Sequence, residues 1–309
     1  MSESSATLNH PPRRFWRNPV AIKELRGRMR GRRAFVVLTV YLALMAGFIT
    51  LVYAAYLAGS SPSNPDARLA GKTIFSALVI AQLFLVVFIA PAFTAGTITG
   101  EREKQTYDIL RTTLLSEGAF IGGKLQSALA YVLLLLAAAI PLESIAFLMG
   151  GVSLSELIIS QVMLVQGSLT FALLGLFFSS LMRTTLAATV ATFAATFFVT
   201  IGFPILIFLL ISILGPLIAA ASSFTPIWPL PALAIYVGLA LVATNLPASM
   251  ILSEIILIEE GTVWAFTATI DGHPLLVLSP WYLHLFCSIL FAWLLYTLTI
   301  RRLRRPSAT

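Results

Sequence analysis

Charge and cysteine are both scarce in this chain. Only 11% of its 309 residues are Asp, Glu, Lys or Arg, whereas a soluble globular domain carries about a quarter. Hydrophobic residues make up 58% of the chain. This composition excludes a water-soluble enzyme. The single cysteine, Cys287, excludes an intramolecular disulfide and a metal site built from several cysteines.

Long uncharged runs are the main feature of the sequence. Several exceed the roughly 18 residues that mark a membrane-spanning helix, which predicts an all-α, polytopic membrane helical bundle. Residues 34–300 would form a single transmembrane domain, between a cytoplasmic tail with an amphipathic interfacial helix at 1–33 and a basic cytoplasmic tail at 301–309. Six spans are expected, at about 34–58, 74–99, 125–147, 157–182, 184–212 and 277–300.

Lysine and arginine set the predicted orientation, because cytoplasmic loops are enriched in both. With six spans, nearly all of them lie on one side of the membrane, together with both termini. An eight-span arrangement would instead place part of 247–275, which is acidic and has no Lys or Arg, in the cytoplasm. We therefore expect a multi-pass protein of the plasma membrane with both termini cytoplasmic.

The stretch 213–276 is then external or re-entrant, and we expect a re-entrant external hairpin before the last span. Two extra spans in this stretch are the alternative. Pro204 is expected to kink the fifth span, and the later prolines to break any long helix. These later prolines are Pro216, Pro226, Pro229, Pro231 and Pro247.

A short amphipathic helix is predicted just before the first span. Asn18 would cap it and Pro19 would take its favoured first position. Its basic face suits anionic lipid headgroups and its apolar stripe suits the membrane interface. A basic anchor without a defined angle is the alternative. The residues of interest on this helix are Lys23, Glu24, Leu25 and Arg26.

The segment 100–124 is the one sizeable cytoplasmic loop of the six-span arrangement. Opposite charges three or four residues apart, such as Glu101 with Lys104 and Lys104 with Asp108, support a solvent-facing helix. That helix should end near Thr113, and Ser116 can cap a second turn. The pattern predicts a helix, a break and a second helix, although a solvated charged loop would also account for the charges.

These two segments together resemble the permease subunits of type-2 ATP-binding-cassette (ABC) exporters. Asn-Pro followed by Lys-Glu-Leu-Arg before the first span is similar to the family, as is the Glu-Arg-Glu loop after the second. Gln105 stands where the family often has Gly, and Leu114 where it often has Pro. The loop residues that match are Gly100, Glu101, Arg102, Glu103, Thr106, Asp108, Leu110, Thr112, Thr113, Leu115, Ser116, Gly123 and Lys124.

The resemblance implies a permease that forms the transmembrane path for export of an unidentified substrate. In the family this loop docks on a separate ATPase subunit, which binds the ATP and Mg²⁺, and the permease forms a homodimer or a heterodimer with a related permease. No cofactor, metal or nucleic acid is expected on this chain itself. The coupling role carries over to Glu101, Arg102, Glu103, Thr106, Asp108, Leu110, Thr113 and Ser116.

The sequence holds no complete nucleotide-binding loop of its own. Gly71-Lys72-Thr73 gives only the end of the phosphate-binding pattern, and Asp66 stands where its first glycine must be. We assign this segment no nucleotide role and expect the chain not to be an enzyme.

Isolated polar and small residues leave alternatives open. Glu143 is expected near the interface, and His273 and His284 are not expected to bind a metal. Ala92, Gly96 and Gly100 recur every four residues and suit close helix contact. The alternative functions are a membrane scaffold or regulator that transports nothing, and an intramembrane enzyme that uses Glu143 or the acidic group Glu254, Glu259 and Glu260.

Overall fold

The protein is described by a computed structural model that covers residues 19–29, 32–59, 66–107, 116–222, 229–270 and 272–304. Six of the described helical segments are long and apolar enough to span a membrane, so the prediction of a multi-pass helical bundle with six such helices is confirmed. They are α2 (Arg32–Gly59), α3 (Ala67–Ala92) with α4 (Thr97–Glu103), α6 (Glu117–Leu148), α7 (Leu154–Leu181), α8 (Thr185–Phe197) continuing through the π-helix η2 (Phe198–Gly202) into α9 (Phe203–Ser222), and α12 (Pro280–Arg304).

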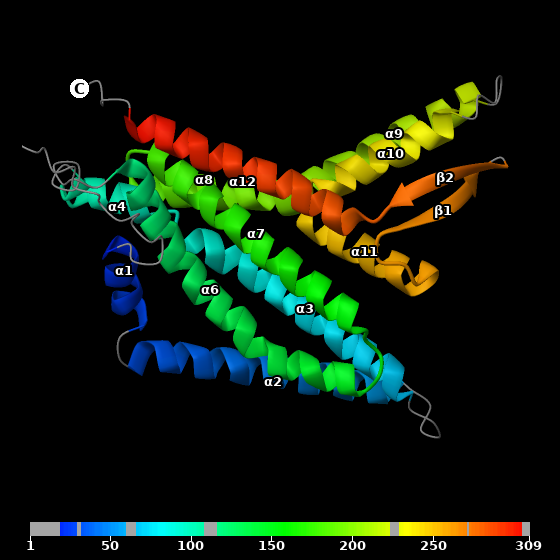
Figure 1. Ribbon diagram of the computed structural model, residues 1–309, viewed down its shortest axis with the longest axis horizontal. Coiled ribbons are helices and arrows are strands. Elements are labelled where there is room, and N and C mark those ends of the chain that lie inside the picture. Colours follow the sequence, from blue (N-terminus) through cyan, green and yellow to red (C-terminus); the bar gives the residue numbers. More distant parts are fainter. Residues whose placement is uncertain are drawn as a thin grey trace, which may run out of the picture.

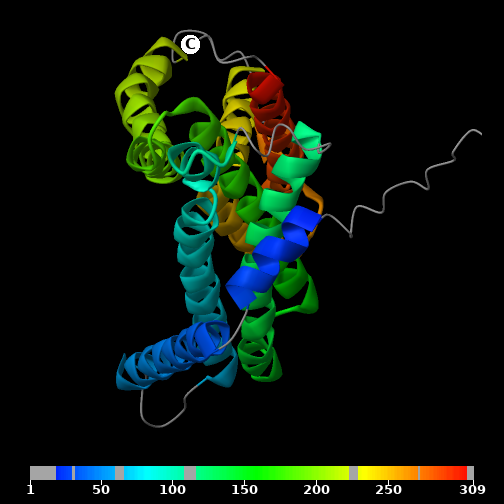
Figure 2. The same cartoon turned by 90° about the vertical axis from the view of Figure 1, so that its left-hand side faces the viewer.

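Helix α7 lies at the centre of the bundle and packs against α3, α6, α8 and α12. It begins where the Ser153 hydroxyl accepts a hydrogen bond from the Glu156 backbone N–H at 3.2 Å. Small residues let its neighbours approach closely: a Cβ added at Gly167 would lie 2.4 Å from the side chain of Leu246. Figures 1 and 2 show α2 and α12 on opposite sides of the bundle.

The short helix α1 (Pro19–Met29) starts at the expected residue and packs against α6. Asn18, the predicted cap, lies outside the described residues. In Figure 1, α1, α4 and the C-terminal end of α12 lie at one end of the bundle. We call this end of the bundle the α4 end.

The stretch between the fifth and sixth spans holds more structure than the sequence predicted. It contains α10 (Pro229–Ala243), α11 (Leu246–Glu260) and two antiparallel strands, β1 (Ala265–Ile270) and β2 (His273–Leu278). The prediction of a helical bundle is confirmed for the described helices, and these two strands are a small β element added to it. Alternate residues of β2, Leu275 and Val277, are buried in a small apolar cluster with α10, which is the two-residue period of a half-buried strand.

The prediction that Pro216 breaks a helix is also wrong, since Pro216 lies inside α9. Proline interrupts one hydrogen bond of a helix, and membrane helices tolerate it where the surroundings satisfy the freed groups. Pro229 instead begins α10, and Pro247 lies in the first turn of α11. Both are positions where proline fits a helix. Pro226 lies outside the described residues.

Near Pro204 the helix changes to π geometry over Phe198–Gly202. Pro204 has no N–H, so the carbonyls four and five residues earlier lose their usual donor. The side-chain amide of Asn245 supplies it, donating to the Val199 oxygen at 2.7 Å and the Thr200 oxygen at 3.2 Å. The Asn245 carbonyl oxygen also accepts from the Ala248 N–H at 2.9 Å and caps α11. Asn245 therefore ties the fifth span to the α10–α11 turn.

We expect Asn245→Ala to lower the free energy of unfolding of the purified protein by about 1–2 kcal/mol. The substitution removes the amide that donates to the Val199 and Thr200 carbonyls, and it also removes the cap of α11. Asn245→Ser is the matched control, since serine can still cap α11 but cannot reach the two carbonyls. Melting followed by circular dichroism should place Asn245→Ser between wild type and Asn245→Ala. Equal melting temperatures of all three proteins would contradict the double role of Asn245 as carbonyl partner and helix cap.

Candidate functional site

The segment 97–107 at the α4 end is the candidate site, and its helix is held by contacts from α7. Helix α3 ends at Ala92, the chain turns through 93–96, and α4 begins at Thr97. The Ser179 hydroxyl of α7 accepts from the backbone N–H groups of Ile98 at 2.9 Å and Thr99 at 3.2 Å. It thus satisfies two N–H groups that a helix start leaves without an intrahelical partner.

Close packing fixes the turn that precedes α4. A Cβ added at Gly175 of α7 would lie 2.1 Å from the Thr94 hydroxyl oxygen and 3.0 Å from the Pro91 carbonyl oxygen. Any larger residue at 175 would push the turn away from α7. The placement of α4 therefore depends on a glycine and a serine four residues apart on one face of α7.

The buried ammonium group of Lys124 joins three elements at this end. Lys124 lies on α6, is only 5% exposed, and forms ion pairs with Glu101 of α4 at 2.9 Å and with Glu24 of α1. Thr106 donates its hydroxyl to Glu101. The Ser127 hydroxyl lies 3.3 Å from a Glu24 oxygen and 2.9 Å from the Lys124 carbonyl oxygen, and its one proton serves one of these acceptors at a time. The Glu101 carboxylate thereby gains a further donor, which a buried charge needs.

Arg102 and Glu103 reach different elements from Glu101. The Arg102 guanidinium donates to the carbonyl oxygens of Ser180 and Met182 at 3.3 Å, where α7 ends, and lies 5.3 Å from the centre of the Tyr107 ring. The Glu103 carboxylate accepts from the N–H and the hydroxyl of Thr185, both at 2.7 Å, at the start of α8. A carboxylate is favourable there because a helix N-terminus is electropositive.

Gln105 follows α4 with a φ of 57°, the one described non-glycine residue with positive φ. Residues other than glycine are strained in this left-handed conformation. The exposed residues Lys104 and Gln105 thus sit on a tight turn that projects from the α4 end. The turn presents them next to the anchored residues Glu101 to Glu103.

The structure brings several of the predicted site residues together and places others elsewhere. Glu101 and Thr106 form one contact network, and Glu24 joins it through Lys124. Arg102 and Glu103 lie beside it but contact the end of α7 and the start of α8. Ser116 accepts from the Ala119 N–H at 3.3 Å and caps α6, as predicted. Lys23, Leu25 and Arg26 lie on α1 with Glu24. The residues outside the described ranges are Asp108, Leu110 and Thr113, together with Thr112, Leu114 and Leu115.

The small residues Ala92, Gly96 and Gly100 do not share one helix. Ala92 is exposed at the end of α3, Gly96 precedes α4 and Gly100 lies within it. A Cβ added at Gly96 would lie 2.8 Å from a methyl carbon of Thr185, so Gly96 lets α8 come close to the turn. A Cβ at Gly100 would meet the same residue at 4.0 Å.

Sequence reasoning missed the residues that hold the segment in place. Ser179 and Thr185 lie about eighty positions after their partners in α4, and no local pattern announces such pairs. Lys124 matched the family pattern, but its ion pairs were not predicted. The sequence places Lys124 at the boundary between the charged loop and the third span, where a lysine needs no partner, so it gave no signal of the ion pairs.

A second polar cluster surrounds Glu143, which was expected near the membrane interface. Its side chain is fully buried between helices. It accepts hydrogen bonds from the side-chain amide of Gln82 on α3 and from that of Gln161 on α7 at 2.6 Å. Two amides supply donors that water would otherwise provide, so the residue does not need to reach the headgroups.

The acidic group considered for catalysis is not assembled into one site. Glu254 pairs with Lys72 at 3.1 Å, and Lys72 also pairs with Glu156 at 2.7 Å, which ties α3, α7 and α11 together away from the α4 end. Glu259 and Glu260 are exposed. Within the described ranges, no group of three or more His, Cys, Asp and Glu residues is placed to hold a metal ion.

Known proteins add no assignment to this geometry. No protein-family profile matches the sequence, and no curated protein matches it significantly.

We expect Lys124→Met to loosen the α4 end, because it removes the ion pairs that Glu24 and Glu101 both form with this ammonium group. The loss of stability should be about 1–3 kcal/mol. This is less than for a fully buried ion pair, because both carboxylates are partly exposed. Proteolysis in native membranes should then cut near 24–32 and 104–107 faster than in wild type. Adding Glu24→Gln and Glu101→Gln should restore much of the protection, whereas unchanged proteolysis in the single variant would contradict the role of Lys124.

Proposed function

We propose that this chain is the membrane-spanning permease subunit of an ABC exporter. Two copies, or one copy with a related permease, would enclose a path across the plasma membrane, and both termini would be cytoplasmic. A separate ATPase subunit would dock on the segment 100–124 and supply the energy.

The observation that carries this proposal is the anchoring of Glu101, Arg102 and Glu103. These three consecutive residues contact α6, the end of α7 and the start of α8, respectively. A force applied to this segment would therefore reach several spans at once. A segment that only solvates the chain has no need for such anchoring.

The conformation at Gln105 supports the family resemblance independently of the charges. The family often has glycine at this position, and Gln105 has the left-handed backbone that glycine adopts without strain. The turn that the family sequence favours is thus present although this chain has another residue there. This agreement concerns backbone shape, whereas the Glu-Arg-Glu match concerns side chains.

Coupling would work by differential binding. An ATPase that binds the turn at 104–107 with higher affinity in one conformation of the permease shifts the conformational equilibrium toward that conformation. The Lys124 ion pairs and the Arg102 and Glu103 contacts would transmit the shift to α1, α6, α7 and α8. Transport follows when the two states expose the path to opposite sides of the membrane.

We predict that an ATP-hydrolysing subunit copurifies with the tagged protein from native membranes. Lys104→Glu should weaken this association at least tenfold, because it reverses an exposed charge on the docking turn while leaving the Lys124 contacts in place. Arg301→Glu, which reverses an exposed charge on α12 at the same end, is the matched control and should retain the partner.

Three outcomes separate the alternatives. Copurification without substrate movement into vesicles would favour the scaffold or regulator. Equal recovery of the partner with wild type and Lys104→Glu would remove the docking role of the turn. Failure of any ATP-hydrolysing subunit to copurify with wild type would overturn the proposal.

A further inference from the structure

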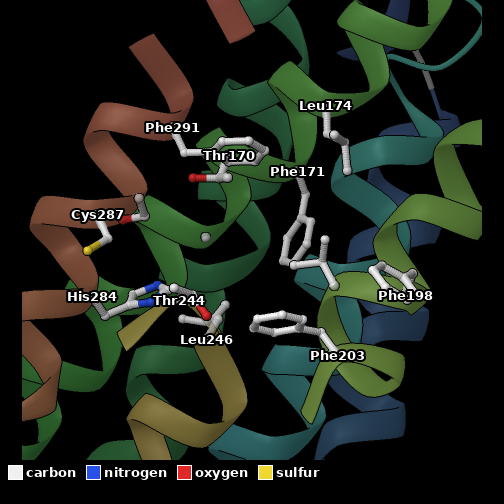
Figure 3. Close-up of a pocket in the computed structure, with 13 residues that line it drawn as sticks. Thr170, Phe171, Leu174, Phe198, Phe203, Thr244, Leu246, His284, Cys287 and Phe291 are labelled. Carbon is white, nitrogen blue, oxygen red and sulfur yellow. The ribbon is translucent and has the colours of Figure 1, made fainter. Parts of the chain in front are cut away.

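A half-open cavity of about 300 Å³ lies where the fifth span meets α7, α12 and the α10–α11 turn. Figure 3 shows Phe171, Phe198, Phe203 and Phe291 around it, together with Leu246. Ligand sites in proteins have this size and this mostly apolar lining, with a few polar groups that fix orientation. The π-helix forms part of the wall, and such segments are frequent at functional sites.

The hydroxyl groups of the wall have already donated their protons. The Thr170 hydroxyl donates to the Gln166 oxygen at 3.1 Å, that of Thr244 to Leu241 at 2.7 Å and that of Ser288 to Leu285 at 3.1 Å. A hydroxyl has one proton, so each of these groups offers a ligand only acceptor capacity.

His284 adds a further acceptor. It is 4% exposed, and its Nδ1 lies 2.8 Å from the Ala243 carbonyl oxygen. A carbonyl only accepts, so Nδ1 carries the proton and Nε2 of the neutral ring is an acceptor. This Nε2 is buried and has no hydrogen-bond partner among the described residues. A buried acceptor without a partner is unfavourable, and a ligand that donates to it would remove that cost.

The lining therefore defines the chemistry of an occupant. No lining residue is charged, and the polar groups other than the weak thiol donor of Cys287 are acceptors. A phosphate or carboxylate group needs hydrogen-bond donors, and these acceptors offer it none. A plain hydrocarbon would fill the aromatic part but leave Nε2 unpaired. A neutral molecule with an apolar chain and one hydroxyl satisfies both parts of the wall.

We propose that this cavity binds a neutral long-chain alcohol or an equivalent hydroxyl-bearing lipid, with the hydroxyl donating to the acceptors around His284 and the chain packed among the four phenylalanine rings. The bilayer supplies such molecules directly. The binding does not depend on the transport proposal, because the test needs no ATPase.

Cys287 makes the test simple. It is the only cysteine of the chain, it is partly exposed and it lines the cavity. We would follow the rate of its alkylation by N-ethylmaleimide in the full chain reconstituted in phosphatidylcholine nanodiscs. The probes are 1-decanol, its methyl ether and decanoate, at equal mole fractions in the lipid. The ether has the same chain and an oxygen, but it has no proton to donate.

We expect 1-decanol to protect Cys287 with an apparent affinity about fivefold to tenfold higher than that of the ether, the gain of roughly one hydrogen bond. Decanoate should protect least. Equal protection by the alcohol and the ether in wild type would overturn the proposal, because the cavity would then recognise only the hydrocarbon chain of the probe. Absence of protection by all three probes would overturn it as well.

Two variants locate the effect. His284→Phe should abolish the difference between alcohol and ether, while the matched control His273→Phe, an exposed residue on β2, should keep it. His284→Phe also removes the hydrogen bond from His284 to the Ala243 carbonyl oxygen. Thr170→Trp therefore serves as a second variant, which fills the cavity and leaves that hydrogen bond intact. Protection by decanol that survives Thr170→Trp would place binding elsewhere and contradict the proposal.

Discussion

The α4 end depends on one requirement, that the ammonium group of Lys124 be paired inside the protein. An unpaired buried charge is too costly to keep, so Lys124 must be met by carboxylates, and those come from α1 and α4. The pairing fixes both short elements on α6. Lys124 is the ion-pair partner that α1 and the Glu101 segment share. The remaining contacts, from Ser179, Arg102 and Glu103, then orient α4 relative to α7 and α8.

Features that arise from composition or local pattern could be predicted from the sequence. The six apolar segments, the start of α1 at Pro19 and the cap at Ser116 are of this kind. The β-hairpin had a local signal as well, since Asp271-Gly272 between residues that alternate in burial is a hairpin pattern, and Gly272 has a φ of 80°. The surrounding residues are so apolar that they also fit a membrane segment, which conceals the hairpin signal in the sequence.

Contacts between residues distant in the sequence could not be predicted in this way. Glu143 shows the reason: its distance from the end of its helix suggested the interface, but two glutamines on other helices made burial possible. Asn245 is similar, because its role follows from a proline on another helix that removes a donor. In each case a polar group inside the bundle is satisfied by a partner that only the folded structure identifies.

The proposed coupling requires that the turn after α4 faces the compartment that holds ATP. The most direct measurement labels Lys104→Cys and, separately, Thr267→Cys on β1, each in a Cys287→Ser background, with a membrane-impermeant maleimide added to one side of sealed vesicles. We expect residue 104 to react only from the cytoplasmic side and residue 267 only from the opposite side. Reaction of residue 104 from the external side alone would contradict the claim, because no cytoplasmic ATPase could then reach the turn.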